Sequence, residues 1–507
     1  MLAMSADPPD APIPDVPMDG PLDVPLDVLI VGAGLSGIGA AAEIRRRFPQ
    51  RSLALLESRA RLGGTWDLFR YPGIRSDSDM YTLGFAAKPW RHTRAIVDGP
   101  SILNYLREMA QESGIAPLIR YGKQVVAAEW SSARALWTVT VRNAGGELEE
   151  WRAKFLQLCT GYYSYSEAHR PSFEGEADFR GRIIHPQFWP EDLDYSRQRV
   201  VVIGSGATAV TLVPALAERA AHVTLLQRSP SYIASQPGDD PLARALAPWL
   251  PAWLVYPVVR WKNILTSALF YRIARARPRL FRKWLIDLAA ASLPPGFPVR
   301  KHFAPHYNPW DQRVCAAPNG DLFKEICAGR VSVVTDHIDR FVPEGIKLAS
   351  GDLLPADLVV TATGLKVQPL GGLRLVVDGK PVEFGDTMVY RGAMLSGIPN
   401  MVHTFGYTNA SWTLRADLIA HYLCRLLRHL DRHGFDYVLA RRDPTVGERP
   451  FIDFNSGYVL RALPLLPKQG ARFPWRIHQN YLRDLGVMRF SRLTDPALEF
   501  HRKGEAA

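Results

Sequence analysis

Two glycine-rich stretches, DVLIVGAGLSG at residues 27–37 and RVVVIGSGATA at residues 199–209, decide the fold of this chain. Each begins with an apolar run typical of a buried β-strand and continues, past its glycines, into a segment of helical composition. Glycines at this spacing permit a tight turn and let the backbone approach a pyrophosphate at the N-terminus of the helix. The pattern predicts an α/β protein with two Rossmann-like dinucleotide-binding domains.

The residue that ends the second strand of each fold indicates which dinucleotide it binds. In the first fold the apolar run 53–56 ends at Glu57, whose carboxylate can accept hydrogen bonds from a ribose. In the second fold the run 222–226 is followed by Gln227 and Arg228, and an arginine there can pair with a 2′-phosphate. We therefore predict FAD in the first fold, NADPH in the second, and hydride transfer from nicotinamide to flavin.

Two further strand endings, at 156–161 and 357–364, have the composition expected where the chain crosses between the two domains. They place the second domain as an insertion within the first. The predicted divisions are a disordered tail over 1–21, an FAD-binding domain built from 22–160 and 371–507, and an NADPH-binding domain over 161–370 with a helical insertion at about 238–300.

The net charge of +11 does not indicate a nucleic-acid partner, because most of the excess lies in one segment. Residues 260–301 contain ten basic side chains and one acidic side chain, Asp287, without a recognisable nucleic-acid-binding module. The four cysteines are scattered without metal-ligand spacing, which predicts no metal site and favours the cytoplasm. The N-terminal residues lack the apolar core of a signal peptide. The oligomeric state stays open.

Apolar and basic residues recur at helical spacing over residues 265–288, which predicts one amphipathic helix. Two interpretations of this helix remain open. It could pack on the NADPH domain with a solvated basic face, or it could lie on an anionic membrane as a peripheral attachment.

Two longer motifs lie outside the glycine-rich stretches. The first runs from Gly63-Gly64-Thr65-Trp66 through Tyr71-Pro72-Gly73 to Asp77, and the second comprises Phe179, Gly181, His185, Trp189 and Pro190. Both match the sequence fingerprints of Baeyer–Villiger monooxygenases. On these residues, and on DLFRYPGIRSDSDMYTLGF at 67–85 and KHFAPHYNPWDQR at 301–313, the chain resembles the class B flavoprotein monooxygenases, and within the Baeyer–Villiger family the ethionamide-activating branch.

The resemblance implies roles for residues at matching positions. Arg313 corresponds to the active-site arginine, and Asp77 to the aspartate beside the flavin that positions it. The implied FAD contacts are Gly32, Gly34, Ser36, Gly37, Glu57, Thr65, Trp66, Asp67, Leu68, Arg75, Ser76, Asp77 and Val125, and the implied NADPH contacts are Gly204, Ser205, Gly206, Ala207, Thr208, Ala209, Val210, Gln227 and Arg228. His185 and Trp189 are expected to act through domain geometry. Many relatives have lysine where Gln312 stands, so selectivity for NADPH should rest more on Arg228.

The implied reaction uses NADPH and molecular oxygen and proceeds through a C4a-peroxyflavin. A small hydrophobic ketone would give an ester or lactone, and a thioether would give a sulfoxide. A guanidinium at Arg313 suits this chemistry because it stabilises a peroxide anion and the oxyanion formed from a carbonyl. The aromatic stretches 162–165 and 405–412 are candidate walls of the substrate pocket.

Two other functions remain open at this point. An NADPH-dependent flavin oxidase or reductase that releases peroxide would bind the same cofactors. A non-catalytic FAD-binding redox scaffold would consume no NADPH and would leave Arg313 without a purpose. A disulfide reductase is disfavoured because no paired cysteines flank the first fold, and an N-hydroxylating enzyme fits Trp189 poorly.

Overall fold

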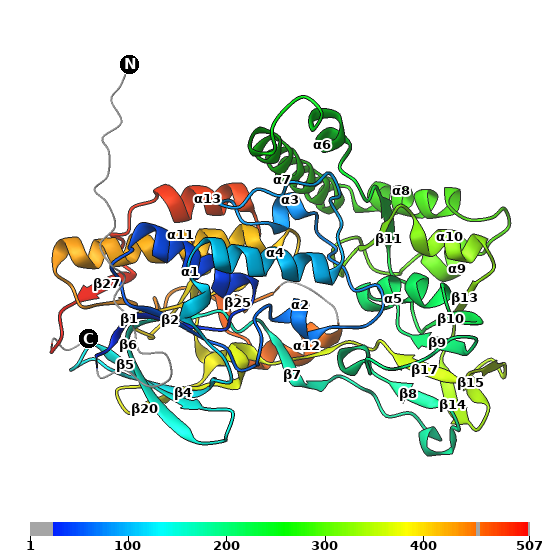
Figure 1. The fold of residues 1–507 in the computed structure, drawn as a ribbon, viewed down its shortest axis with the longest axis horizontal. Coiled ribbons are helices and arrows are strands. Elements are labelled where there is room, and N and C mark those ends of the chain that lie inside the picture. Colours follow the sequence, from blue (N-terminus) through cyan, green and yellow to red (C-terminus); the bar gives the residue numbers. More distant parts are fainter. Residues whose placement is uncertain (1–23, 453–456, 505–507) are drawn as a thin grey trace.

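The computed structural model describes residues 24–452 and 457–504, so the tail predicted over 1–21 lies outside the described residues. Two β-sheets lie towards opposite ends of the long axis (Figure 1). One is built around β1 (Leu26–Val31) and the other around β9 (Arg199–Ile203), the strands that precede the two glycine-rich turns. The predicted α/β fold with two Rossmann-like domains is confirmed.

The larger sheet has nine strands. They are β1, β2 (Leu53–Leu56), β3 (Ile119–Arg120), β4 (Gln124–Ser131), β5 (Leu136–Arg142), β6 (Leu148–Leu158), β19 (Arg374–Val377), β20 (Lys380–Val382) and β23 (Met401–His403). Their order is β20-β19-β4-β5-β6-β1-β2-β3, with β23 beside the end of β6. Strands β6, β1, β2 and β3 run parallel. The turn after β1 therefore lies at the carboxyl edge, where α/β sheets bind ligands.

The smaller sheet is entirely parallel. Its strands are β8 (Arg182–Ile184), β9, β10 (His222–Gln227), β13 (Val331–Thr335) and β17 (Leu358–Thr361), in the order β13-β10-β9-β17-β8. Helices α5 (Ala207–Ala217) and α10 (Asp321–Cys327) pack on it. All five strands come from the part of the chain between β6 and β19. The sequence of the larger sheet is thus interrupted by the smaller one.

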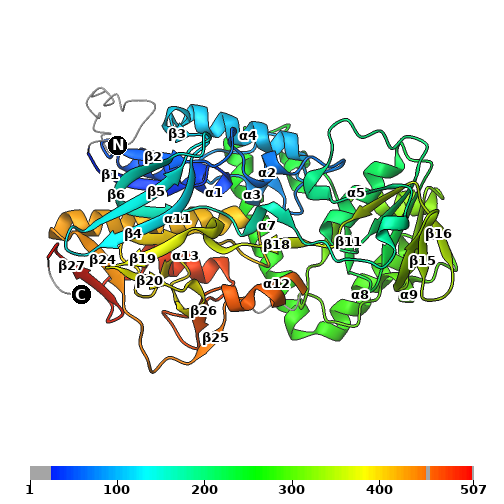
Figure 2. The ribbon, with the colours of Figure 1, turned by 90° about the horizontal axis from the view of Figure 1, so that it is seen from below.

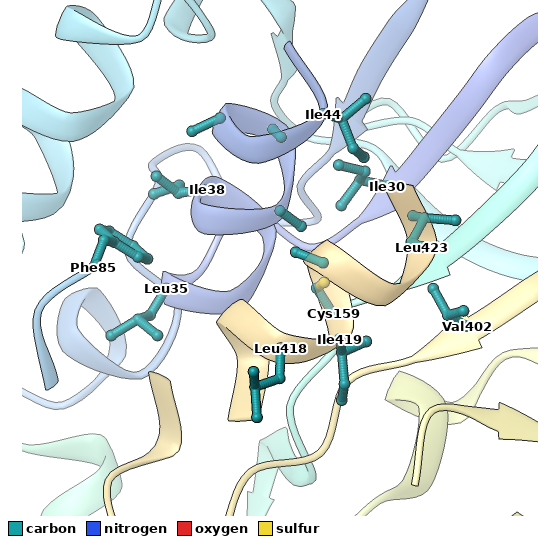
Figure 3. Close-up of a cluster of buried hydrophobic side chains, with 14 of the residues drawn as sticks. Ile30, Leu35, Ile38, Ile44, Phe85, Cys159, Val402, Leu418, Ile419 and Leu423 are labelled. Atoms are coloured by element: carbon teal, nitrogen blue, oxygen red, sulfur yellow. The ribbon is translucent and has the colours of Figure 1, made fainter. Parts of the chain in front are cut away.

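Helix α1 (Leu35–Arg47) holds the first glycine-rich turn against the core. Residues 40–42 are alanines, which favour helix, and the last turn carries three arginines that suit the helix C-terminus. Ile38 and Ile44 are buried in a cluster with Ile30 of β1 and Leu423 of α11 (Trp412–His433) (Figure 3). Burying each isoleucine stabilises the fold by roughly 1.5–3 kcal/mol.

Two short strands connect the sheets. β7 (Tyr163–Ala168) and β18 (Leu365–Val367) pair antiparallel, and β18 lies in the middle of the molecule (Figure 2). The segment that enters this connection and the segment that leaves it lie close together. A Cβ added at Gly371 would lie 3.3 Å from the Cβ of Thr160.

A helical segment follows β11 (Ile233–Gln236). It contains α6 (Pro241–Leu246), α7 (Ala252–Ala276), α8 (Pro278–Ala291) and α9 (Val299–Phe303). The prediction of one helix over 265–288 is wrong: α7 ends at Ala276 and α8 begins at Pro278, because proline lacks an N–H and disfavours helical conformation at the residue before it. The two helices also pack against different parts of the protein. Helix α8 contacts β11, whereas α7 contacts α3 (Met80–Leu83), an element of the first fold.

Smaller elements complete the fold. The remaining helices are α2 (Thr65–Leu68), α4 (Gly99–Glu112), α12 (Gly457–Ala462) and α13 (Tyr481–Phe490), and the remaining strands are β12 (Cys315–Pro318), β14 (Ile338–Val342), β15 (Gly345–Leu348), β16 (Leu353–Pro355), β21 (Val389–Tyr390), β22 (Met394–Leu395), β24 (Tyr437–Ala440), β25 (Glu448–Pro450), β26 (Lys468–Gly470) and β27 (Leu498–His501). Among the described residues, no helix combines the length and the apolar character that crossing a bilayer requires.

Candidate active site

The first glycine-rich turn leaves no room for a side chain at Gly32 or Gly37. Gly32 has φ +102°, and a Cβ added there would lie 2.5 Å from the carbonyl oxygen of Cys159. A Cβ at Gly37 would lie 1.9 Å from the carbonyl oxygen of Gly32. The family motif closes over this turn, because a Cβ at Gly64 would meet the Cα of Gly34 at 3.1 Å. Backbone can therefore approach a bound pyrophosphate closely from both sides of this site.

A cavity of about 410 Å³ opens at this turn. Eight of the residues that the resemblance assigns to FAD binding or catalysis line it, namely Gly32, Gly34, Ser36, Glu57, Thr65, Trp66, Val125 and Arg313. Six others do not, namely Gly37, Asp67, Leu68, Arg75, Ser76 and Asp77. The cavity also contains residues that the sequence did not single out, including Lys123 and the connecting segment at Leu370 and Gly371. Their local sequence does not indicate a binding site, because only the folded chain brings these residues to the glycine-rich turn.

Glu57 lies at the end of β2 and is buried. Its Oε2 accepts a hydrogen bond from the backbone N–H of Ala33 at 2.9 Å, and its Oε1 accepts one from the backbone N–H of Arg59 at 3.0 Å. Burial raises the pKa of this carboxyl above its ordinary value. The carboxylate is therefore held on the turn, facing the cavity where the ribose of a dinucleotide would be bound.

Asp67 makes ion pairs instead of lining the cavity. Its side chain is buried, and its carboxylate lies 2.8 Å from Arg59 and 3.1 Å from Arg61. Arg70 approaches it at 3.4 Å. Arg75 similarly pairs with Asp321 of α10. These contacts tie the loop after α2 in place, so any contribution of the two residues to FAD binding is through this loop.

Arg313 and Asp77 meet although they lie 236 residues apart in the sequence. Nη1 of Arg313 donates to Oδ2 of Asp77 at 2.7 Å, and the two side chains are 38% and 40% exposed. Arg313 lines the main cavity and also a second, mainly apolar pocket of about 20 Å³ beside it. The guanidinium thus stands at the junction of the dinucleotide site and a space with apolar walls.

The second pocket is walled by aromatic residues from both stretches proposed from sequence. Tyr162 stacks on Trp412 with ring centroids 5.3 Å apart, and Phe405 lies 5.2 Å from Tyr162. Nε1 of Trp412 donates to Oγ of Ser36 at 2.8 Å, which links this wall to the glycine-rich turn. The rest of the wall includes Ile452, Val459 and Leu466, which the sequence did not indicate.

The second glycine-rich turn repeats the geometry of the first. Gly204 has φ +138°, and a Cβ there would lie 2.3 Å from the carbonyl oxygen of Ala362. Apart from its chain neighbours, a Cβ placed on Gly206, at the start of α5, would meet open space. Arg228 follows β10 directly and is exposed, whereas Gln227 is buried. The amide of Gln227 donates to His302 O at 2.8 Å and to Thr335 Oγ1 at 2.9 Å, so it acts in packing.

The two family motifs connect the two folds. Gly73, in the loop after α2, packs on α5 of the second fold, since a Cβ there would lie 2.7 Å from both Ala215 Cβ and Thr211 O. In the second motif, His185 Nε2 lies 3.2 Å from Gly364 O, just before β18, and burial lowers the pKa of this histidine. Phe179 and Trp189 pack in the cores of the second fold. The action of His185 and Trp189 through domain geometry stays a prediction.

Within residues 24–452 and 457–504, no cluster of three or more His, Cys, Asp or Glu side chains could hold a metal ion.

Two sequence profiles match the chain. One, for flavin-binding monooxygenase-like proteins, matches residues 91–250, and one for an NAD(P)-binding Rossmann-like domain matches residues 30–98. The chain is 55% identical over 480 residues to the FAD-containing monooxygenase EthA of Mycobacterium tuberculosis, covering 94% of this chain and 98% of that protein. It is 53% identical over 485 residues to EthA of Mycolicibacterium smegmatis, covering 95% and 98%.

Solved structures show the same fold at lower identity. An oxidised steroid monooxygenase bound to NADP matches with a TM-score of 0.73 and 21% identity, covering 94% of this chain and 100% of that chain. Cyclohexanone monooxygenase from Rhodococcus sp. Phi1 bound to NADP+ matches with a TM-score of 0.72 and 19% identity, with the same coverage.

Two glycine-rich turns on two β-sheets, with an arginine between a dinucleotide cavity and an apolar pocket, define a two-dinucleotide oxidoreductase. The sequence identities define a narrower group within this class: the chain belongs to the family of FAD-containing monooxygenases. The family membership expected from the sequence motifs is confirmed, and the protein is an enzyme.

Proposed function

We propose that this monooxygenase uses NADPH and molecular oxygen to convert a small hydrophobic ketone into an ester or lactone, and a thioether into a sulfoxide. The observation that carries the proposal is the position of Arg313, which lines both the dinucleotide cavity and the apolar pocket. A cation at that junction can stabilise negative charge on a reacting oxygen while an apolar substrate occupies the part of the larger cavity beside Tyr162 and Trp412.

The residues present fit FAD at the first turn. The backbone at the glycines of this turn, the N-terminus of α1 and the buried Glu57 provide the groups that bind a pyrophosphate and a ribose. FAD bound there would supply the redox chemistry that amino-acid side chains lack. In domain terms, we assign FAD to 22–160 and 371–507.

The second turn fits NADPH, and we assign that cofactor to 161–370. Gly204 to Thr208 would face the pyrophosphate, whereas Ala209 and Val210 are buried in α5, and Arg228 is placed to pair with the 2′-phosphate. The two solved structures of similar fold named above are bound to NADP or NADP+. Because Gln227 is occupied by packing contacts, the selectivity for the phosphate rests on Arg228.

Arg313 and Asp77 have different roles in the proposed reaction. Arg313 holds its positive charge beside the oxygen atom that becomes anionic, where a unit charge ~4 Å away at an effective dielectric of 20 contributes ~4 kcal/mol before desolvation. Asp77 orients the guanidinium through the 2.7 Å hydrogen bond. Tyr162, Phe405 and Trp412 form an apolar wall that limits water near the substrate.

The test measures how oxygen and NADPH are used. The FAD-loaded protein is mixed with NADPH and either cyclohexanone or methyl phenyl sulfide, and product is compared with NADPH oxidised. We expect lactone or sulfoxide in proportion to NADPH consumed. If neither product forms and the amount of hydrogen peroxide equals the amount of NADPH consumed, the protein is an oxidase and the proposal is wrong. No NADPH consumption at all would indicate a redox scaffold.

A further inference from the structure

Apolar side chains are concentrated on the exposed side of α7 and α8. Of the 22 large apolar side chains that are exposed in the described chain, twelve lie between residues 249 and 284. They include Trp249, which is 84% exposed, and Trp253, which is 65% exposed. We call these twelve side chains the α7–α8 surface. Single exposed apolar residues are ordinary, whereas many gathered on one short segment of the chain indicate an interaction site.

The apolar residues of α7 form a stripe along one side of the helix. Leu254, Val258, Trp261, Leu265 and Leu269 recur every three or four residues and are all exposed. The other side of the helix is already packed: Tyr256 Oη donates to Phe85 O at 2.9 Å, and Arg260 donates to Tyr81 O at 2.7 Å. The stripe is therefore a second apolar face, additional to the one that holds α7 on the fold.

Positive charge accompanies the stripe. Apart from Arg260, which faces the fold, residues 252–291 contain seven lysines and arginines and one acidic residue, Asp287. Arg272, Arg277 and Arg279 are exposed, and none of the three has an ion-pair partner among the described residues. A partner for this surface must be apolar at its centre and negatively charged around it.

We propose that the α7–α8 surface binds the face of a bilayer that contains anionic lipid. The tryptophans and leucines would enter the region between headgroups and acyl chains, and the arginines would contact lipid phosphates. A second copy of this chain suits the surface less well, because a two-fold contact would bring the same arginines together. Helices α6 and α7 lie along the upper edge of the molecule in Figure 1, so a flat membrane can reach them.

The surface is also close to the apolar pocket. A cavity of about 110 Å³ lies behind α7, between Ile264 and Ala268 on the helix and the loop at Asn409 and Ser411. This loop leads directly into Trp412, which lines the pocket beside Arg313. If the proposed function holds, on which this point rests, docking places the pocket near hydrophobic substrates dissolved in the bilayer.

Vesicle flotation of the full-length, FAD-loaded protein tests the proposal without any turnover. Phosphatidylcholine vesicles are compared with phosphatidylcholine vesicles that contain phosphatidylglycerol, at low and high salt. We expect flotation with the anionic vesicles and its loss at high salt, because salt screens surface charges. Each arginine near an anionic surface is worth roughly fivefold in partitioning, so R272Q/R277Q/R279Q should weaken binding roughly a hundredfold.

Two variants on α7, W253S and L265S, test the apolar contribution and should each weaken binding roughly tenfold. The matched controls are L148S and K380Q, which change exposed residues of the larger sheet and should bind like the unmodified protein. Flavin absorbance and melting temperature show that each variant is folded. The proposal is overturned if the unmodified protein stays free of anionic vesicles at low salt, if the controls lose binding equally, or if W253S instead turns a dimer into a monomer.

Discussion

Replacing Arg313 by alanine should separate catalysis from stability. The ion pair with Asp77 is 2.7 Å long, but both side chains are more than a third exposed. Such a pair contributes about 0–1 kcal/mol to the free energy of unfolding, because solvent screens the charges. The melting temperature of Arg313→Ala should therefore stay close to that of the unmodified protein, and FAD and NADPH should still bind.

The effect on oxygen transfer should be far larger. Removing a charge that stabilises a developing oxyanion costs roughly a hundred- to a thousandfold in turnover, which corresponds to about 3–4 kcal/mol. We expect lactone formation by Arg313→Ala to fall by this factor, while NADPH oxidation continues and yields hydrogen peroxide. The assay measures lactone, peroxide and NADPH in the same reaction.

The matched control is Arg199→Ala. Arg199 also forms an exposed 2.7 Å ion pair, with Asp357, and lies outside both pockets. This variant should form lactone at a normal rate. The assignment of Arg313 is refuted if Arg313→Ala still makes lactone near the normal rate, or if its melting temperature falls so far that lost folding explains the lost activity.

Three other predictions concern binding and stability. Gly32→Ala should lose bound flavin, measured by visible absorbance, because its Cβ would lie 2.5 Å from Cys159 O. Gly114→Ala, at φ +65° with open space around it, should retain flavin and cost only the backbone strain of about 1–2 kcal/mol. Arg228→Ala should raise the KM for NADPH roughly ten- to a hundredfold and leave that for NADH unchanged, since only NADPH carries the 2′-phosphate; equal losses for both coenzymes would contradict this. Burial lowers the pKa of His403 from 6.5 to about 4. As the pH falls from 6.5 to 4, the histidine therefore binds a proton in the unfolded state but not in the folded state, and the free energy of unfolding falls by about 3 kcal/mol. Denaturant titrations should show that His403→Gln loses this part of the pH dependence, and an unchanged profile would show that another group causes it.

Local sequence was sufficient for the parts of the site that each lie within one supersecondary unit. The glycine-rich turns, Glu57 at the end of β2 and Arg228 at the end of β10 could be located because strand, turn and helix follow one another within a few dozen residues. Positive φ angles and close carbonyl contacts at Gly32 and Gly204 give the physical reason for those glycines. The helix break at Pro278 was visible in principle but was outweighed by helical periodicity on both sides of it.

Arg313, Asp77 and Trp412 show what depended on the tertiary structure. The sequence contained each residue, and family resemblance suggested the first two, but hydrophobic periodicity and turn signals act over short distances along the chain. The contact between Arg313 and Asp77 spans 236 residues, and that between Trp412 and Ser36 spans 376. Such contacts form only when both sheets, the connection through β7 and β18, and the C-terminal segment have packed together. Packing therefore decided where the guanidinium stands, which walls face it, and that α7 keeps one apolar side exposed.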